Sequence, residues 1–318
     1  MSAAAALRIG TRDSALALWQ ARHVAALLAA QPGAPSAELV HISTSGDLER
    51  HVPLWQVDGR AFFTREIDRA LLEDTVDVAV HSLKDLPTQI EAGLTLAAVL
   101  TRADPRDALV SRSGAKLAEL PRGARIGTSS LRRRAFLARL RPDAVLLELR
   151  GNVPTRIERL RRGDYDAIVL AAAGLARLGL DGEVSEYLDT DSFPPAVSQG
   201  VIGVCVRAED VATLRWVVPL DDREARLAIT AERALLRRLE GGCQVPLGAL
   251  ATVRDGTLAL QASVCALDGS RHLSARGQAP AAPGEAAALG TRIAEELLGR
   301  GAGELIARER EARAVEEP

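Results

Sequence analysis

This sequence lacks a cysteine framework, a long apolar run and a secretory signal. The three cysteines, at positions 205, 243 and 265, have neither disulfide-type nor metal-ligand spacing, so we expect no disulfides and no metal site. No window approaches the roughly 18 uninterrupted apolar residues of a membrane span, and the N-terminal residues lack a basic flank followed by a long apolar region. The sequence therefore predicts a soluble, cytoplasmic protein.

Lysine is also scarce, since only Lys84 and Lys116 are lysines among the 40 basic residues. The net charge is −2, but it is unevenly distributed. From position 102 to 177, 16 arginines and one lysine stand against eight acidic residues, a local excess of +9. A basic region in a slightly acidic protein favours an acidic ligand. The abundance of arginine alone does not indicate a function, because arginine replaces lysine almost throughout the sequence. A lysine at position 84, beside Asp85, is more informative.

The first hundred residues alternate between strand and helix patterns. Apolar runs predict strands at 7–11, 38–43 and 77–83, and helical periodicity predicts helices at 15–30 and 62–74. The first helix is expected to start after Asp13 or Ser14. Its predicted apolar face, with His23 packed in the core, consists of Leu16, Trp19, His23, Ala26 and Leu27. The alternation predicts an α/β layer with a largely parallel sheet, whose ligands lie beyond the carboxyl ends of the strands.

A second alternating run follows a polar stretch at 101–105. Strands are predicted at 125–128, 145–149 and 166–171, each followed by a helix, and a further strand at 201–206. Three basic junctions, at 128–133, 150–156 and 174–177, are expected to converge on one anion-binding cleft. Linkers near 101–105 and 193–200 predict a chain that leaves one lobe, builds another and returns, which gives a hinged cleft.

The last third combines a long helix with alternating strands. The helix is predicted at 221–239, the strands at 247–253, 257–265 and 272–277, and a closing helix at 285–298. Asp255-Gly256 is a typical hairpin turn. The charged tail from 304 to 318 is expected to be a solvated, frayed helix end.

Two residues are candidates for chemistry. Cys205 and Cys265 alternate within apolar strands and are interpreted as small core residues. Cys243, in contrast, follows a glycine pair that ends a helix, so its thiol is expected on an accessible loop, where a covalent attachment point would have to be. Taken alone, it is better interpreted as a loop cysteine with no role.

Asp85 lies at a strand end, at the predicted mouth of the arginine-rich cleft. Nearby positive charge keeps a carboxylate ionised. An ionised Asp85 is suited to stabilise a cation developing on a bound ring and to accept a hydrogen bond from a ring N–H. Of the consecutive arginines 132–134, Arg132 and Arg133 are expected in the site and Arg134 in solvent.

Five motifs together resemble the porphobilinogen deaminases, also called hydroxymethylbilane synthases. They are RIGTR (8–12), HSLKDLP (81–87), GTSSLRR (127–133), LRGN (149–152) and LEGGCQVP (239–246). The resemblance runs in the same order from about position 7 to about 305. It implies two lobes like those of periplasmic binding proteins, with mostly parallel mixed sheets, and a smaller α+β domain with a three-stranded antiparallel sheet. The implied domains are 1–101 with 199–219, 102–198 and 220–318.

The resemblance also implies a function, a transferase of tetrapyrrole biosynthesis. A dipyrromethane cofactor would be held on Cys243 by a thioether, four porphobilinogen molecules would be joined to it with loss of ammonia, and hydrolysis would release hydroxymethylbilane. Asp85 would be the catalytic carboxylate. The residues implied to bind the acetate and propionate groups are Arg12, Ser14, Ser82, Lys84, Thr128, Ser130, Arg132, Arg133, Arg150, Arg156, Arg177 and Gln199. The protein would be a monomer that binds neither nucleic acid nor membrane.

One loop departs from the resemblance. Where these enzymes commonly carry a lysine- and glycine-rich loop, residues 55–62 read WQVDGRAF. Gln56 and Asp58 reduce the positive charge there, and Arg60 is the one residue of the loop that we expect to contact carboxylates.

Two other functions compete with this interpretation. A non-enzymatic two-lobed anion-binding protein explains the arginines and the hinge, but it needs neither Cys243 nor a third domain. A nucleic-acid binder would use the basic middle region, but Phe136 and Tyr165 are its only aromatic residues and offer little stacking surface.

Overall fold

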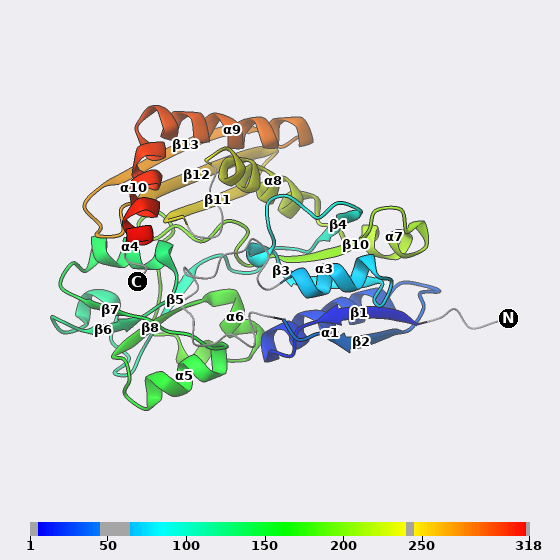
Figure 1. Cartoon of the computed structure of the whole chain (residues 1–318), viewed down its shortest axis with the longest axis horizontal. Helices are drawn as coiled ribbons and strands as arrows, with labels where there is room; N and C mark the ends of the chain where they lie inside the picture. Colours follow the sequence, from blue (N-terminus) through cyan, green and yellow to red (C-terminus); the bar gives the residue numbers. More distant parts are fainter. Residues whose placement is uncertain (1–5, 45–63, 240–244, 316–318) are drawn as a thin grey trace.

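The computed structural model describes residues 6–44, 64–239 and 245–315 (Figure 1). A five-stranded mixed sheet forms the first lobe, in the order β2-β1-β3-β10-β4. Its strands are β1 (Leu7–Thr11), β2 (Ala37–His41), β3 (Val78–Ser82), β4 (Leu94–Val99) and β10 (Ile202–Arg207). β1, β2 and β3 are parallel, whereas β10 is antiparallel to both β3 and β4.

Helices cover both faces of this sheet. On one face lie α1 (Ala15–Ala29) and α7 (Val211–Val217), and on the other lie α3 (Arg65–Leu72) and the first half of α8 (Arg223–Arg238). The side chains of β10 alternate between the two cores, with Val204 on the α1 side and Cys205 on the α3 side. This alternation places Cys205 in the interior, as predicted, and burial raises the pKa of its thiol to about 12.

The second lobe repeats the same pattern. Its sheet has the order β7-β6-β8-β5-β9, from β5 (Asp107–Ser111), β6 (Arg125–Gly127), β7 (Val145–Leu147), β8 (Ala167–Ala171) and β9 (Glu186–Tyr187). β6, β7 and β8 are parallel and β5 is antiparallel to β8. The helices are α4 (Leu131–Leu140), α5 (Val153–Arg161) and α6 (Ala172–Arg177). The chain thus has two lobes with mixed sheets, as the resemblance implies.

A third unit lies over both lobes (Figure 1). Its antiparallel sheet contains β11 (Leu247–Arg254), β12 (Thr257–Cys265) and β13 (His272–Pro280), packed against α8 and α9 (Pro283–Gly299). The predicted hairpin turn is confirmed, since Asp255 and Gly256 both have positive φ, 48° and 72°. Such a pair gives the two-residue turn whose twist matches the flanking strands.

Two crossing segments join the lobes and run side by side. The amide of Leu100 donates to the carbonyl of Ile202 (3.0 Å), and that of Ala103 donates to the carbonyl of Gly200 (3.1 Å). Gly200 has a φ of 89°, and a Cβ there would lie 2.6 Å from the Ala103 oxygen. Glycine is therefore required where the two crossings touch.

The third unit holds both crossings through one carboxylate. Glu232 of α8 is completely buried and accepts hydrogen bonds from Arg102 Nη1 (2.5 Å), from the Ser198 amide (2.6 Å) and from the Ala251 amide of β11 (2.8 Å). Because Arg102 and Ser198 belong to different crossings, Glu232 fixes the hinge to the C-terminal sheet.

The first helix buries a different face from the predicted one. The buried residues of α1 are Gln20, Ala21, Val24 and Leu28, whereas His23 is exposed and stacks on Trp19 with ring centroids 5.1 Å apart. The prediction that His23 is a core residue is therefore wrong. Gln20 takes a buried position because its amide nitrogen donates to Ser82 Oγ (2.8 Å), which offsets the cost of burying a polar group.

The structure contains elements that the sequence did not reveal. Strands β4, β5 and β9 and helix α7 were not predicted. The tail is also more structured than expected, because α10 (Ala302–Val315) buries Leu305 and Ile306 against the C-terminal core. None of the helices in the described segments combines the length and the apolar character that a membrane crossing needs.

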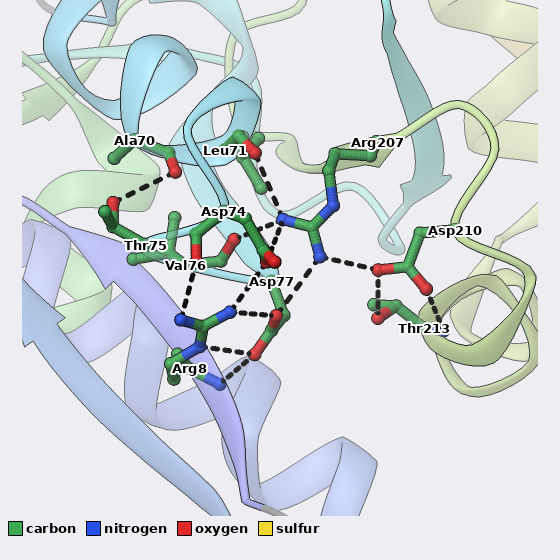
Figure 2. A network of polar contacts seen from close by, with 10 residues as sticks. All are labelled: Arg8, Ala70, Leu71, Asp74, Thr75, Val76, Asp77, Arg207, Asp210 and Thr213. Carbon is green, nitrogen blue, oxygen red and sulfur yellow. Dashed lines mark hydrogen bonds and ion pairs between the residues drawn. The ribbon is translucent and has the colours of Figure 1, made fainter.

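A network of ion pairs closes the first lobe at the start of β1 and the end of β10 (Figure 2). Asp77 accepts from Arg8 Nη2 (2.7 Å) and from Arg207 Nη2 (3.2 Å), and Arg207 also donates to Asp210 (2.7 Å). Burial alone would raise the pKa of Asp77, but the hydrogen bonds from Arg8 and Arg207 lower it to about 2. Through Asp77 the network links β1, the first strand of this sheet along the chain, to β10, the last.

We expect Asp77→Asn to lower the free energy of unfolding by about 1–2 kcal/mol at pH 7, since hydrogen bonds to charged groups contribute that much after screening. The pKa of folded Asp77 is depressed, so its contribution is present above the unfolded pKa of about 4 and is lost as the pH falls towards about 2. Urea unfolding at pH 7, 5 and 3 measures this. The control Asp74→Asn, with a side chain 71% exposed, should change little; an equal loss in both variants, or a difference that persists undiminished at pH 3, contradicts the prediction.

Candidate functional site

The predicted catalytic residue lies on a short 3-10 turn directly after β3. This turn spans Leu83–Asp85; Leu83 is completely buried, and its amide donates to the Val201 carbonyl (3.0 Å). The half-buried Asp85 is thereby presented at the carboxyl end of β3, as expected for a ligand site in such a sheet.

A cavity of about 80 Å³ opens at this end of the first lobe. Arg12, Ser14, Ser82 and Asp85 line it, together with Gln20 and His81. Ser14 also caps α1, because its side chain accepts a hydrogen bond from the Ala17 amide (3.2 Å). The structure therefore brings together four of the residues that the resemblance implied.

His81, beneath this cavity, is held neutral. Burial, followed by the nearby Arg12 guanidinium, lowers the pKa of His81 to about 4. Its Nε2 lies 3.6 Å from Asp68 Oδ1, and burial raises the pKa of Asp68 to about 6. At neutral pH the cationic side of the cavity is therefore supplied by Arg12 and not by His81.

The second lobe presents its site residues at the start of α4. Ser130 caps this helix by accepting from the Arg133 amide (3.4 Å), and the buried Thr128 hydroxyl accepts from the Ser130 amide (3.2 Å). Arg132 and Arg133 follow in the first turn. Both are buried, while Arg134 is half-buried and donates to the Leu146 carbonyl (3.4 Å).

Arg132 and Arg133 share one buried carboxylate, Asp107 of β5. Arg132 Nη2 and Arg133 Nη2 each lie 2.7 Å from an Asp107 oxygen, and Gln199 Nε2 lies 3.1 Å from the same carboxylate. Burial alone would raise the pKa of Asp107, but the two guanidiniums lower it to about 2. Gln199 comes from the return crossing, and Arg132 Nη1 also donates to the Pro194 carbonyl (2.7 Å), so this cluster connects the start of α4 to the hinge.

Cations from both lobes meet around Asp85. Burial lowers the pKa of Lys84 to about 8; Asp85 opposes this shift and Arg133 adds to it. Burial also lowers the pKa of Arg156 to about 10, with further lowering by Arg133 and by Arg150. Such mutual effects require the first-lobe pair at 84–85 and these second-lobe arginines to lie near one another.

Glu148 accompanies these arginines and was not predicted. It favours the charged forms of both Arg150 and Arg156, and its Oε1 is buried without a hydrogen-bond partner among the described residues. Asp107 was also missed, because the strand around it was not recognised. A signal existed for Glu148, which is a single acidic residue in an apolar run, whereas Asp107 directly follows Arg106 at the edge of its run.

One predicted junction lies apart from the others. Arg177 Nη2 donates to the Gly200 carbonyl (2.7 Å), and its guanidinium carbon lies 5.7 Å from the centre of the Trp19 ring. Burial lowers its pKa to about 10. The junctions at 128–133 and 150–156 thus converge near Asp85, whereas Arg177 bridges the second lobe to α1 and the hinge.

Two predicted site residues, Cys243 and Arg60, lie outside the described residues, as does the whole divergent loop at 55–62. Cys265 is buried beside α4, as expected, with its Sγ 3.6 Å from the Ala135 carbonyl. Within the segments that the structure describes, no cluster of three or more potential metal ligands occurs.

Comparisons with known proteins cover nearly the whole chain. The family model "Porphobilinogen deaminase, dipyromethane cofactor binding domain" matches residues 7–215, and "Porphobilinogen deaminase, C-terminal domain" matches residues 226–299. The curated porphobilinogen deaminase of Roseiflexus sp. (strain RS-1) is 52% identical over 302 residues, 95% of this chain and 98% of the relative. That of Syntrophotalea carbinolica is 48% identical over 302 residues, 95% of each chain.

Likeness to solved structures is more distant. The VFT2 domain of Bordetella pertussis BvgS has 14% sequence identity and a TM-score of 0.42, over 68% of this chain and 86% of that one. A likeness at this level has no bearing on function.

We expect Asp107→Asn to lower the free energy of unfolding by about 3–5 kcal/mol, because it removes the partner of two buried guanidiniums. The control is Asp104→Asn, whose partner Arg106 is 43% exposed; this variant should lose about 1 kcal/mol or less. Urea unfolding at pH 7 compares the two. Similar small losses would show that Asp107 does not hold Arg132 and Arg133 as described.

Proposed function

The chain belongs to the porphobilinogen deaminase family, and we propose that the cleft around Asp85 is where it carries out the family's reaction. Four porphobilinogen molecules are joined head to tail on a dipyrromethane cofactor with loss of ammonia, and hydrolysis releases hydroxymethylbilane. The observation that supports the placement is that one crossing contacts both sets of residues, those around Asp85 in one lobe and those around Arg133 in the other. Val201 accepts from the Leu83 amide, two residues before Asp85 (3.0 Å), and Gln199 contacts Asp107, the partner of Arg132 and Arg133 (3.1 Å).

The residues of the cleft fit an anionic cofactor and product. Burial is the largest cause of the lowered pKa of Arg156; repulsion by Arg133 and Arg150 lowers it further, and Glu148 and Asp85 oppose this. A ligand that carries carboxylates relieves this repulsion and matches the planar fork of arginine. When bound, dipyrromethane supplies a nucleophilic pyrrole carbon and a covalent tether for the growing chain.

Each group of residues then has a defined task. Asp85 stabilises the positive charge that develops on a porphobilinogen ring as ammonia leaves, and it accepts a hydrogen bond from the ring N–H. Lys84 and the arginines bind the acetate and propionate groups, which orients each ring for attack. The residues proposed for this binding are Arg12, Ser14, Ser82, Lys84, Thr128, Ser130, Arg132, Arg133, Arg150, Arg156, Arg177 and Gln199, with Arg60 as a further candidate.

For Arg132, Arg133 and Gln199, the internal contacts limit how they serve. All three contact Asp107 in this structure, so some of their N–H donors are already occupied. We therefore propose that they attract the carboxylates of the ligand by their positive charge and bind them through N–H groups that do not contact Asp107.

The cofactor is proposed to be attached through a thioether to Cys243, which follows Arg238, the last residue of α8, by five positions. A tether makes each addition intramolecular, which raises the effective concentration of the reacting carbon. We further propose a monomeric cytoplasmic transferase that binds neither nucleic acid nor membrane, with domains at 1–101 with 199–219, 102–198 and 220–318. The non-enzymatic alternative is not favoured, since close relatives over 95% of the chain are deaminases.

Intact-protein mass spectrometry tests the attachment. The purified protein is expected to carry an added mass of two linked pyrroles, and Cys243→Ser is expected to lack it. Cys205→Ser serves as the matched control and should retain the adduct, because Cys205 is buried within β10. A wild-type protein that turns over porphobilinogen without any adduct would refute the proposal.

A further inference from the structure

Two arginines of α8 contact the loop that follows Asp85. Arg233 is buried; its Nη1 donates to the Leu86 carbonyl (3.1 Å) and its Nη2 to the Pro87 carbonyl. One turn further along the helix, Arg237 Nη2 donates to the Thr88 carbonyl (2.9 Å). Three consecutive carbonyls after Asp85 therefore accept hydrogen bonds from a helix of the C-terminal unit.

The other side of the same turn is held by the hinge. The Leu83 amide donates to the Val201 carbonyl (3.0 Å), and the Leu86 amide donates back to the Leu83 carbonyl (3.2 Å). Leu83 and Leu86 also pack in one core cluster with Ile229 of α8. Asp85 is thus placed between one anchor in the hinge and one on α8.

These contacts are suited to fix a backbone. A guanidinium presents its donors in a rigid plane, so a buried arginine that contacts two successive carbonyls restrains both their positions and their orientation. Hydrogen bonds from a charged donor are stronger than neutral ones. These bonds restrain the backbone of the loop at 86–88, and therefore also that of Asp85, which directly precedes it.

We propose that Arg233, supported by Arg237, is a positioning residue that holds the Asp85 carboxylate at a fixed place relative to the helix leading to Cys243. The inference rests on the proposed function of Asp85 and Cys243. Its physical basis is that α8 is connected to both residues. It contacts the loop after Asp85, and its last residue precedes the proposed attachment point by five positions. Displacing a catalytic group by about 1 Å is enough to slow a reaction by about 100-fold.

The same helix offers a matched control. Arg226 Nη1 donates to the Leu96 carbonyl (3.1 Å) and its Nη2 to the Ala97 carbonyl (3.2 Å). Like Arg233, it joins α8 to the first lobe through two successive carbonyls, but to those of β4 and not to the Asp85 loop. Unlike Arg233, it is half-buried and is also paired with Asp221 (2.6 Å). Both Arg226→Met and Arg233→Met remove a contact between α8 and the first lobe, but only Arg233→Met releases the loop that follows Asp85.

Steady-state kinetics on the holoenzyme, with porphobilinogen as substrate, test the proposal. Arg233→Met is expected to retain the dipyrromethane mass, to keep KM within about twofold and to lose at least about tenfold in kcat. Arg226→Met should keep kcat within about twofold. Arg233→Lys should recover part of the loss, because an ammonium still donates to one of the two carbonyls.

Equal kcat values for the two methionine variants would overturn the positioning role, as would a rise in KM with unchanged kcat. If Arg233→Met does not fold, Arg233→Lys is compared with Arg226→Met instead. A lower kcat for Arg233→Lys supports the positioning role, and an equal or higher kcat refutes it. Failure of the wild-type protein to turn over porphobilinogen would refute the proposed function instead.

Discussion

Guanidinium groups crowd together where the two lobes meet, and buried carboxylates make that crowding stable. Asp107 is the clearest case, because it neutralises Arg132 and Arg133 in the interior while its own pKa falls to about 2. Removing two such cations from water without a partner would cost several kcal/mol each. With Asp107 in place, the start of α4 is fixed and is connected to the hinge through Pro194 and Gln199.

The C-terminal unit determines how the two lobes are connected. Glu232 binds both crossings and the edge of β11, and Gly248 of β11 lies so close to Pro194 that a Cβ would be 2.4 Å from the Pro194 carbonyl oxygen. The hinge is therefore packed against the same unit whose helix α8 contacts the Asp85 loop.

The sequence was most informative where local chemistry decides the structure. Ser14 caps α1, one of the two helix starts that the sequence offered, and Asp255-Gly256 forms the expected turn. The motifs around Asp85 and Arg133 indicated the family, which the comparisons confirm.

Features set by distant contacts could not be predicted in this way. β5 was missed because it begins with Asp107, a charged residue that becomes buried only once Arg132 and Arg133 are beside it. The prediction of the buried face of α1 was wrong because the burial of Gln20 requires a hydrogen bond to Ser82, 62 residues away. The contact of Arg233 with the Asp85 loop spans 147 residues, and nothing in the local pattern of α8 indicates it.

We propose Asp85 as the catalytic carboxylate for a chain tethered to this protein. Rapid mixing with excess porphobilinogen, quenching within the first turnover and intact-protein mass spectrometry test it most directly. In the wild-type protein the mass is predicted to rise above that of the cofactor-bearing form in steps of one pyrrole unit. In Asp85→Asn the cofactor mass should be present, but the steps should be slower by at least about 100-fold. Extension of Asp85→Asn at the wild-type rate would contradict the account.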